Sequence, residues 1–280
     1  MPRSVRKHLA EKKVRPERAS SRVPGLLRSR WVAAPLSALL WVSCVVTVIA
    51  WTPLILLFRL LTFPWDRDRY RVGRLFHDSA AFVARINPFW NFRIRDEVHP
   101  DDRRPYVFVA NHSSFTDVFL LASLPWEMKF LSKKSIFRIP LLGWQMRIAG
   151  DVPIVRGDRE SVRAAMEELR RRLDRRLSVV FFPEGTRSPD GSLGEFREGA
   201  FRLAIEAGVP VLPLAIYGAS SSLPKHSVVF QPTAATVVVL PPESTEGLTA
   251  ADAPRLAARV RDRIAEAIRK VEISETPASR

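Results

Sequence analysis

Twelve residues, YVFVANHSSFTD from Tyr106 to Asp117, decide the fold of this chain. The first five are apolar and favour β-structure, which predicts a buried strand over residues 106–110. The apolar run Val118–Leu121 that follows is typical of the body of a helix. His112 therefore lies where a strand passes into a helix, a place where side chains meet solvent and substrate.

His112 and Asp117 can contact each other only if a helix begins between them. On one continuous helix, residues five apart point about 140° away from each other. They meet if His112 precedes the helix and Asp117 lies in its first turn. A neutral histidine held by a carboxylate can take a proton from a hydroxyl. Ser114-x-x-Asp117 is also a capping box, in which Asp117 only closes the helix start, and this stretch alone leaves both interpretations open.

A second apolar run, Leu177–Phe182, predicts another buried strand. It is followed by PEGTRS (183–188), which is polar and charged, and by a turn at Pro189-Asp190-Gly191. Polar residues thus follow two buried strands where each strand ends. This pattern is typical of the rim of an open α/β sheet.

The two motifs together resemble the glycerolipid acyltransferases, specifically the bacterial 1-acylglycerol-3-phosphate acyltransferases. Asn111-His112-x4-Asp117 is followed by Phe182-Pro183-Glu184-Gly185-Thr186-Arg187, in the order that is typical of the family. The resemblance extends from Tyr106 to Tyr217. It includes further segments in order: Lys133-Lys134-Ser135 with Ile139-Pro140 and Gly143, Gly150–Arg156, Gly199-Ala200-Phe201 and Gly208–Pro213.

This resemblance implies a fold and a reaction. The fold is α/β, with a mixed, largely parallel sheet flanked by helices. The reaction moves a fatty acyl group from a thioester to the sn-2 hydroxyl of 1-acyl-glycerol-3-phosphate, giving phosphatidic acid in phospholipid synthesis. The donor is acyl-CoA or acyl carrier protein, a substrate rather than a cofactor. His112 is the expected general base, and Asp117 is expected to fix its tautomer and stabilise the imidazolium.

The resemblance also implies residues that bind the substrate. Arg187 is similar to the family's phosphate-binding arginine, and an arginine fork holds a phosphate bidentately. The alternative to phosphate binding is that Arg187 only forms a surface salt bridge with Glu184. Glu184, Gly185 and Thr186 share its turn: Glu184 is expected to orient Arg187 or the glycerol, and the other two to let backbone N–H groups approach. Lys134 is a further cation near the site.

One segment departs from the family pattern. The family's second motif often reads Gly-x-x-Phe-Ile-Asp-Arg, whereas this chain has Gly150-Asp151-Val152-Pro153-Ile154-Val155-Arg156. Val155 replaces the aspartate and Pro153 the aromatic residue. Arg156 is kept, so anion binding is expected here, but the departure bears on which acceptor headgroup is preferred.

Composition excludes some kinds of chemistry. The 280 residues suit one sizeable catalytic domain with an attachment. Cys44 is the single cysteine, so no intrachain disulfide is possible, and its apolar surroundings do not suit a thiolate nucleophile. The sequence contains no HExxH-like or Cys/His cluster, so no metal site is predicted.

The net charge of +15 is concentrated near the N-terminus. Residues 1–30 hold ten basic residues against Glu11 and Glu17, and they lack the apolar periodicity of a folded element. A basic arm suits either nucleic acid or an anionic membrane. Trp31–Phe58 follows without one charged residue and is long enough to span a bilayer, so the membrane is the expected partner rather than nucleic acid.

Pro53 interrupts this apolar run and leaves two interpretations of it. One is a single kinked span. The other, which the flanking charges favour, is a membrane-embedded hairpin with a helix over about residues 31–51, a turn at Thr52-Pro53 and a return to Phe63. The predicted organisation is thus a basic disordered tail (1–30), a membrane-embedded helical hairpin (31–63) and an acyltransferase catalytic domain (64–280).

With both ends of the hairpin on one side, the catalytic domain is expected on the cytoplasmic face of a bacterial inner membrane. Two other functions stay open. One is an acyltransferase of the same fold that acts on another lysophospholipid or an aminolipid. The other is a non-catalytic membrane adaptor, against which the intact His112, Asp117, Glu184 and Arg187 argue.

Overall fold

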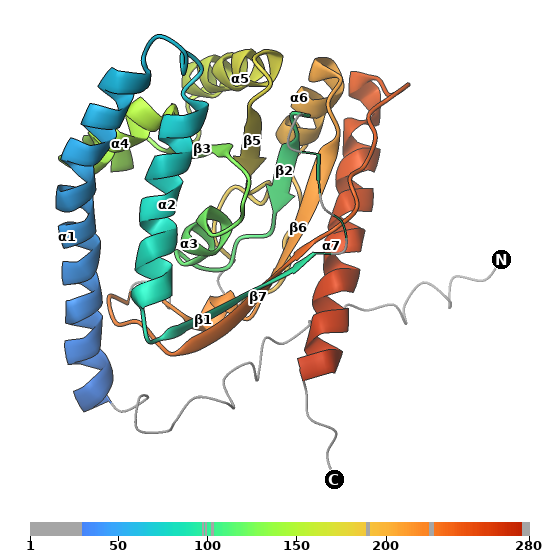
Figure 1. The fold of residues 1–280 in the computed structure, drawn as a ribbon. Helices are drawn as coiled ribbons and strands as arrows, with labels where there is room; N and C mark the ends of the chain where they lie inside the picture. The colour runs from blue at the N-terminus through green and yellow to red at the C-terminus, as the bar shows by residue number, and fades with distance from the viewer. Residues whose placement is uncertain are drawn as a thin grey trace.

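A computed structural model describes residues 30–96, 98, 100–101, 104–188, 191–223 and 227–275, so the predicted basic tail lies outside it except for Arg30. The described residues form a seven-stranded sheet in the order β1-β7-β6-β2-β5-β3-β4 (Figure 1). Neighbouring strands are parallel except for β6 and β7, which confirms the prediction of a mixed, largely parallel sheet. The strands are β1 (Trp90–Asp96), β2 (Val107–Ala110), β3 (Met128–Lys133), β4 (Val152–Ile154), β5 (Ser178–Phe181), β6 (Val211–Tyr217) and β7 (Thr233–Val239).

The two strands that were predicted from the motifs lie side by side at the centre of the sheet. All four residues of β2 are buried, as expected for a strand that is covered on both faces. Successive side chains point to opposite faces. Val107 and Val109 pack with α5 (Arg159–Asp174), α6 (Gly199–Ala207) and α7 (Ala253–Glu275) on one face. Phe108 and Ala110 pack with α3 (Asp117–Ala122) on the other.

The N-terminal helix α1 is one continuous helix, Arg30–Thr62, of 33 residues, and the predicted hairpin within residues 31–63 is wrong. Pro53 lies inside it, and a proline there leaves the preceding turn without its usual hydrogen bond. Polar side chains line that turn: Thr52 Oγ1 donates to the Val48 carbonyl at 2.7 Å, and Gln145 Nε2 donates to the same oxygen at 2.7 Å. These contacts hold the turn before Pro53, although they reach the Val48 carbonyl rather than the Ile49 carbonyl, which Pro53 leaves without its helical donor.

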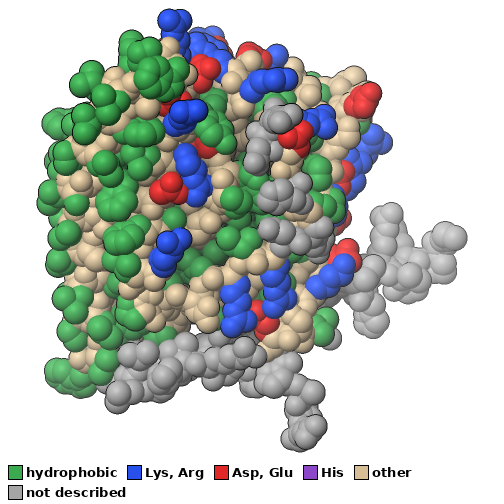
Figure 2. Space-filling view, viewed as in Figure 1, with side chains coloured by type: hydrophobic (Ala, Val, Ile, Leu, Met, Phe, Trp, Pro, Cys, Tyr) green, Lys and Arg blue, Asp and Glu red, His purple; other side chains and the backbone are tan. Residues whose placement is uncertain are grey.

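The chain reverses only after Thr62, and α2 (Tyr70–Ile86) then runs beside α1 (Figure 1). The inward face of α1 is mixed, with the small or polar Ala33, Ser37, Thr47 and Thr52 buried together with Leu40 and Ile55. Its outward face is apolar and exposed, and Figure 2 shows this hydrophobic flank. The residues are Leu39, Val42, Val45, Val46, Ile49, Leu54, Leu56, Leu57, Leu60 and Leu61. By length and composition, Trp31–Thr62 is the one described segment suited to cross a membrane.

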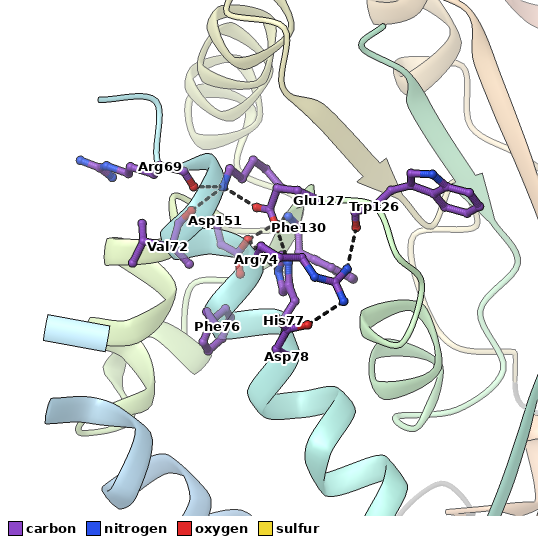
Figure 3. A network of polar contacts seen from close by, with 12 residues as sticks. Arg69, Val72, Arg74, Phe76, His77, Asp78, Trp126, Glu127, Phe130 and Asp151 are labelled. Carbon is purple, nitrogen blue, oxygen red and sulfur yellow. Dashed lines mark hydrogen bonds and ion pairs between the residues drawn. The ribbon is translucent and has the colours of Figure 1, made fainter. Parts of the chain in front are cut away.

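A buried polar network fixes α2 to the amino ends of β3 and β4 (Figure 3). His77 Nδ1 contacts Glu127 Oε2 at 3.0 Å, and Lys129 Nζ contacts Glu127 Oε1 at 2.5 Å. Lys129 also donates to the carbonyls of Arg69 and Ala149, each at 2.7 Å. His77 is therefore a buried structural residue of this network.

Charge pairing decides how the carboxylates of this network ionise. Burial by itself raises the pKa of Glu127, but His77 and Lys129 outweigh it and lower that pKa below its usual value. Asp151 accepts from the Phe130 N–H at 2.9 Å, and burial raises its pKa to about 6. Removing one member would leave a buried partner unpaired, so the network holds α2, and with it α1, in one position.

Gly73 is the point where α2 comes closest to this network. A Cβ atom at position 73 would overlap Glu127 Oε1 and Lys129 Nζ. The two side chains are themselves buried and hydrogen-bonded, so they have little room to move. The glycine is required for the close approach of helix and sheet rather than for a special backbone angle.

We expect Gly73→Ala to lower the free energy of unfolding by about 1–3 kcal/mol, because the methyl group pushes α2 away from the sheet. Denaturant unfolding followed by circular dichroism measures this. Gly199→Ala is the matched control, because its Cβ would meet nothing closer than Met166 Cε at 3.9 Å. That variant should keep its stability or gain up to about 1 kcal/mol. Equal stability of the two variants would contradict the close packing of α2.

Candidate active site

The first motif forms a compact turn around one carboxylate oxygen. Asp117 Oδ2 contacts His112 Nδ1 at 2.8 Å and accepts from the N–H groups of Ser113 and Ser114, each at 2.8 Å. Asp117 is fully buried and is the first residue of α3. The predicted contact of Asp117 with His112 is confirmed. The capping box is formed only in part: Asp117 Oδ2 accepts from the Ser114 N–H, but the helix begins after Thr116 with no side-chain cap hydrogen bond.

This contact sets the chemistry of the imidazole. A carboxylate accepts only, so in the neutral ring Nδ1 carries the hydrogen and Nε2 keeps its lone pair. The ring stacks on Phe182 with centroids 4.1 Å apart and planes 21° apart. Its side chain keeps 12% exposure. The structure thus holds His112 in one orientation, with a basic nitrogen that can reach a bound hydroxyl.

Glu184 has a role that sequence reasoning did not assign. Its Oε1 accepts from the His112 N–H at 2.8 Å and its Oε2 from the Gly194 N–H at 3.0 Å. The predicted alternative, a salt bridge between Glu184 and Arg187, is absent from the described part of the chain. Burial raises the pKa of the Glu184 carboxyl, although both N–H donors oppose that shift. Glu184 fastens the turn between β2 and α3 to the loop after β5.

Asn111 secures the other side of the same turn. Its side-chain Nδ2 donates to the Ile216 carbonyl at 2.9 Å, and its Oδ1 accepts from the Ile216 N–H at 2.7 Å. The amide thus continues the pairing of β2 with β6 by one step after β2 ends. A carboxylate could not donate, and a hydroxyl could not span both groups, so this position favours an amide.

The predicted cations lie at the same edge of the sheet, where the parallel strands β5, β3 and β4 end. Arg187 is next to His112 in space, because the Ser188 N–H donates to the His112 carbonyl at 2.8 Å. Lys134 follows β3, and Arg156 follows β4; both side chains are exposed. Thr186 is exposed in the turn that carries Arg187.

Arg197 is a further cation at this edge, and sequence reasoning missed it. Gly185 has φ 75°, and a Cβ there would lie 2.9 Å from Arg197 Cζ, so the guanidinium covers the glycine. Burial and the nearby charge of Arg197 both lower the pKa of Arg156. The sequence signal was the position of Arg197 two residues before the Gly199-Ala200-Phe201 segment of the family.

Helix α1 contacts the turn between β2 and α3. Trp41 of α1 packs against Phe115, with ring centroids 6.1 Å apart, and against Phe230 at 5.1 Å. Its indole Nε1 donates to the Val228 carbonyl at 2.9 Å. Phe115 lies between His112 and Asp117 in the chain, so the helix with the exposed apolar face directly supports the candidate active site.

The chain is similar to known acyltransferases. A family model described as Acyltransferase matches residues 91–217. A chloroplastic 1-acyl-sn-glycerol-3-phosphate acyltransferase, BAT2 of Brassica napus, is 40% identical over 187 residues, which are 65% of this chain and 51% of that protein. One from Limnanthes alba is 30% identical over 209 residues, which are 73% of this chain and 71% of the relative.

The fold has a solved counterpart. The crystal structure of the 1-acyl-sn-glycerophosphate acyltransferase PlsC from Thermotoga maritima aligns with a TM-score of 0.72 and 25% identity, over 90% of this chain and 99% of that one. The chain spans about half the length of the chloroplastic relatives from Brassica napus and Arabidopsis thaliana that it matches.

We expect Glu184→Ala to lower the free energy of unfolding by about 1–3 kcal/mol, because two backbone N–H groups lose their acceptor. Chemical denaturation at neutral pH measures the loss. Glu195→Ala, in the same loop, is the control, because that side chain is 93% exposed, and it should change stability by less than about 0.5 kcal/mol. If the two variants are equally stable, Glu184 does not hold the turn.

Proposed function

This chain belongs to the family of 1-acyl-sn-glycerol-3-phosphate acyltransferases, and from that premise we propose that it transfers a fatty acyl group from a thioester to the sn-2 hydroxyl of 1-acyl-glycerol-3-phosphate. The product is phosphatidic acid. The observation that carries the proposal is the contact of His112 Nδ1 with the buried Asp117, which leaves Nε2 free at the edge of the sheet beside Arg187.

The geometry supports general-base catalysis. His112 Nε2 takes the proton of the acceptor hydroxyl while the oxygen attacks the thioester carbon, and Asp117 stabilises the imidazolium that forms. The new C–O bond replaces the C–S bond, and the departing thiolate takes the proton back from His112. The net result is an ester and a free thiol. Cys44 is a free thiol among the apolar side chains that pack against α1, which do not suit a thiolate nucleophile, so the proposed route uses no cysteine acyl-enzyme.

Arg187 is the proposed ligand of the acceptor's phosphate. Among the described residues it forms no ion pair or hydrogen bond through its side chain, so its fork is available. It lies beside His112, and in the acceptor only two carbons separate the sn-2 oxygen from the phosphate ester. Lys134 adds charge near the same place. Gly185, with its left-handed φ of 75°, shapes the turn that presents Thr186 and Arg187.

A different acceptor is the second candidate. Val155 and Pro153 stand where the family often has aspartate and an aromatic residue, beside the retained Arg156. Another lysophospholipid or an aminolipid would use the same His112 and Asp117. A non-catalytic adaptor has less support, because it gives no reason for the arrangement around Asp117. The acyl carrier, coenzyme A or acyl carrier protein, is likewise a proposal.

The proposed location is the surface of a membrane, with α1 lying along it. One face of the helix packs against the protein from Ala33 to Thr62, so it could cross the hydrocarbon only by taking α2 with it. α2 carries Arg71, Arg74, Asp78 and Arg85, which would be costly there. We propose the cytoplasmic face of a bacterial inner membrane. The named relatives include chloroplastic proteins, which leaves the compartment as part of the proposal.

We expect His112→Ala and Asp117→Asn each to lower kcat by about 10²–10⁴, because the first removes the base and the second no longer fixes its tautomer or stabilises the imidazolium. The assay follows phosphatidic acid by mass spectrometry, with lysophosphatidic acid and acyl-CoA as substrates. Asp158→Asn is the control: Asp158 also caps a helix, accepting from the N–H groups of Glu160 and Ser161, but holds no histidine. If Asp117→Asn keeps activity as Asp158→Asn does, Asp117 is only a cap.

The membrane placement predicts that both ends of α1 stay on one side. In a Cys44→Ser background, single cysteines replace Trp31 and Trp65, which are exposed at the two ends. The protein is bound from outside to vesicles of phosphatidylethanolamine and phosphatidylglycerol and treated with a membrane-impermeant thiol reagent. Both cysteines should react to the same extent. Reaction at only one end would mean that α1 crosses the bilayer.

A further inference from the structure

A second exposed apolar surface lies next to α1. It belongs to the short helix η4 (Ile136–Arg138) and to α4 (Leu142–Ala149), which follow β3, and α4 contacts α1 (Figure 1). Ile139 is 48% exposed and Trp144 is 58% exposed. One exposed apolar side chain is ordinary, but an isoleucine and a tryptophan that are exposed within one short segment indicate a binding surface.

Gln145 fixes α4 along the edge of the exposed face of α1. Its Nε2 donates to the Val48 carbonyl at 2.7 Å and to Thr52 Oγ1 at 2.6 Å. Residues three apart on a helix are neighbours. Val45 and Ile49, three residues before each of these contacts, are both exposed. Helix α4 therefore lies at the side of the apolar face of α1 and leaves that face open.

The exposed residues of α4 continue this apolar face. Trp144 and Ile148 are four residues apart and share one side of the helix. Gln145, which reaches α1, lies between that side and the buried one, so the exposed side of α4 adjoins the contact with α1. The buried side packs on the protein through Gly143, Met146 and Ala149. The apolar surface of α1 thus extends across Gln145 onto α4.

The turn between η4 and α4 is tightly packed. A Cβ atom at Gly143 would overlap the Phe137 carbonyl oxygen, and Phe137 is itself buried. Arg147 Nη1 donates to the Gly143 carbonyl at 3.0 Å, and its Cζ lies 5.7 Å from the centroid of the Phe137 ring. The exposure of Ile139 and Trp144 is therefore set by the fold.

The charge around this surface favours a membrane as its partner. Residues 128–150 contain no Asp or Glu and five basic residues. Lys129 is buried, and the other four are exposed: Lys133, Lys134, Arg138 and Arg147. An apolar stripe with a basic rim is complementary to a bilayer that contains anionic lipids, because the apolar side chains enter it and the cations meet the headgroups. A second copy of the same surface would instead bring like charges together.

We propose that η4 and α4 form a second membrane contact beside α1, in which Ile139 and Trp144 enter the lipid and Arg138 and Arg147 bind anionic headgroups. The inference rests on the proposed function, which places α1 along a membrane surface. One helix alone leaves the protein free to rotate about the helix axis, and a contact beside it fixes that rotation. Because the segment directly follows β3, the contact also orients the edge of the sheet that carries His112.

The test measures the surroundings of single probes on the full chain. The variants, in a Cys44→Ser background, are Ile139→Cys, Trp144→Cys and, as the control, Ile273→Cys. Ile273 is 76% exposed on α7, across the molecule from α1 (Figure 1). Each cysteine carries the environment-sensitive dye NBD, and vesicles of phosphatidylethanolamine and phosphatidylglycerol are added. We expect emission to rise at least threefold at positions 139 and 144 and less than 1.5-fold at 273. Nitroxide groups on the acyl chains should quench only the first two.

Sedimentation of the vesicles in the same samples separates the outcomes. Bound protein with unchanged emission at positions 139 and 144 would overturn the second contact and leave the placement of α1 standing. Failure of the labelled chain to bind vesicles would overturn both. Emission at 144 that rises with protein concentration in the absence of vesicles would assign the surface to a second copy of the chain. None of these measurements depends on acyl transfer, so they are independent of the reaction.

Arg138→Gln tests the contact with headgroups. Binding to vesicles that contain phosphatidylglycerol should weaken about fivefold, the effect of one cation near an anionic surface, and binding to phosphatidylcholine vesicles should not change. Arg163→Gln is the matched control, because Arg163 lies on α5 with a side chain that is 77% exposed. Equal weakening by the two variants would show an effect of net charge alone and would overturn the role of Arg138.

Discussion

A single buried carboxylate oxygen organises the candidate active site. Asp117 Oδ2 accepts from two backbone N–H groups and from His112, and Asp117 is fully buried. A buried charge is tolerated only when it is paired and hydrogen-bonded. Because its donors come from the turn between β2 and α3, the same contacts that satisfy this oxygen define the turn. Folding of this turn therefore also fixes the orientation of His112.

Charged residues have different roles at the two ends of the strands. At the carboxyl ends of the strands, Glu184 and Asn111 hold the turn between β2 and α3 from two sides. The cations near them have no carboxylate partner in the described chain. At the amino ends of β3 and β4, Lys129 and Glu127 are paired with each other and buried. Paired charges fix structure, whereas unpaired ones remain available for an anionic substrate.

Helix α1 carries an exposed apolar face and also contacts the candidate active site. The outward face of α1 is apolar and exposed, while its inward face packs on α2 and reaches Phe115 through Trp41. A lipid substrate that leaves the membrane beside α1 would have a short path to His112. The buried network beneath α2 keeps this helix pair in register with the sheet, so the distance from the apolar face to the base is set by the fold.

The sequence by itself determined the elements whose signals are local. Alternation and apolar runs predicted β2 and β5, and spacing predicted that His112 and Asp117 meet, because both depend on neighbours a few residues apart. Only the tertiary structure decided the rest. Glu184 meets the His112 N–H across 72 residues, and Gln145 meets Val48 in α1 across 97. Such contacts depend on where the sheet brings distant segments together, which no local pattern records. For the same reason α1 continues through Pro53, and Arg197 lies over Gly185.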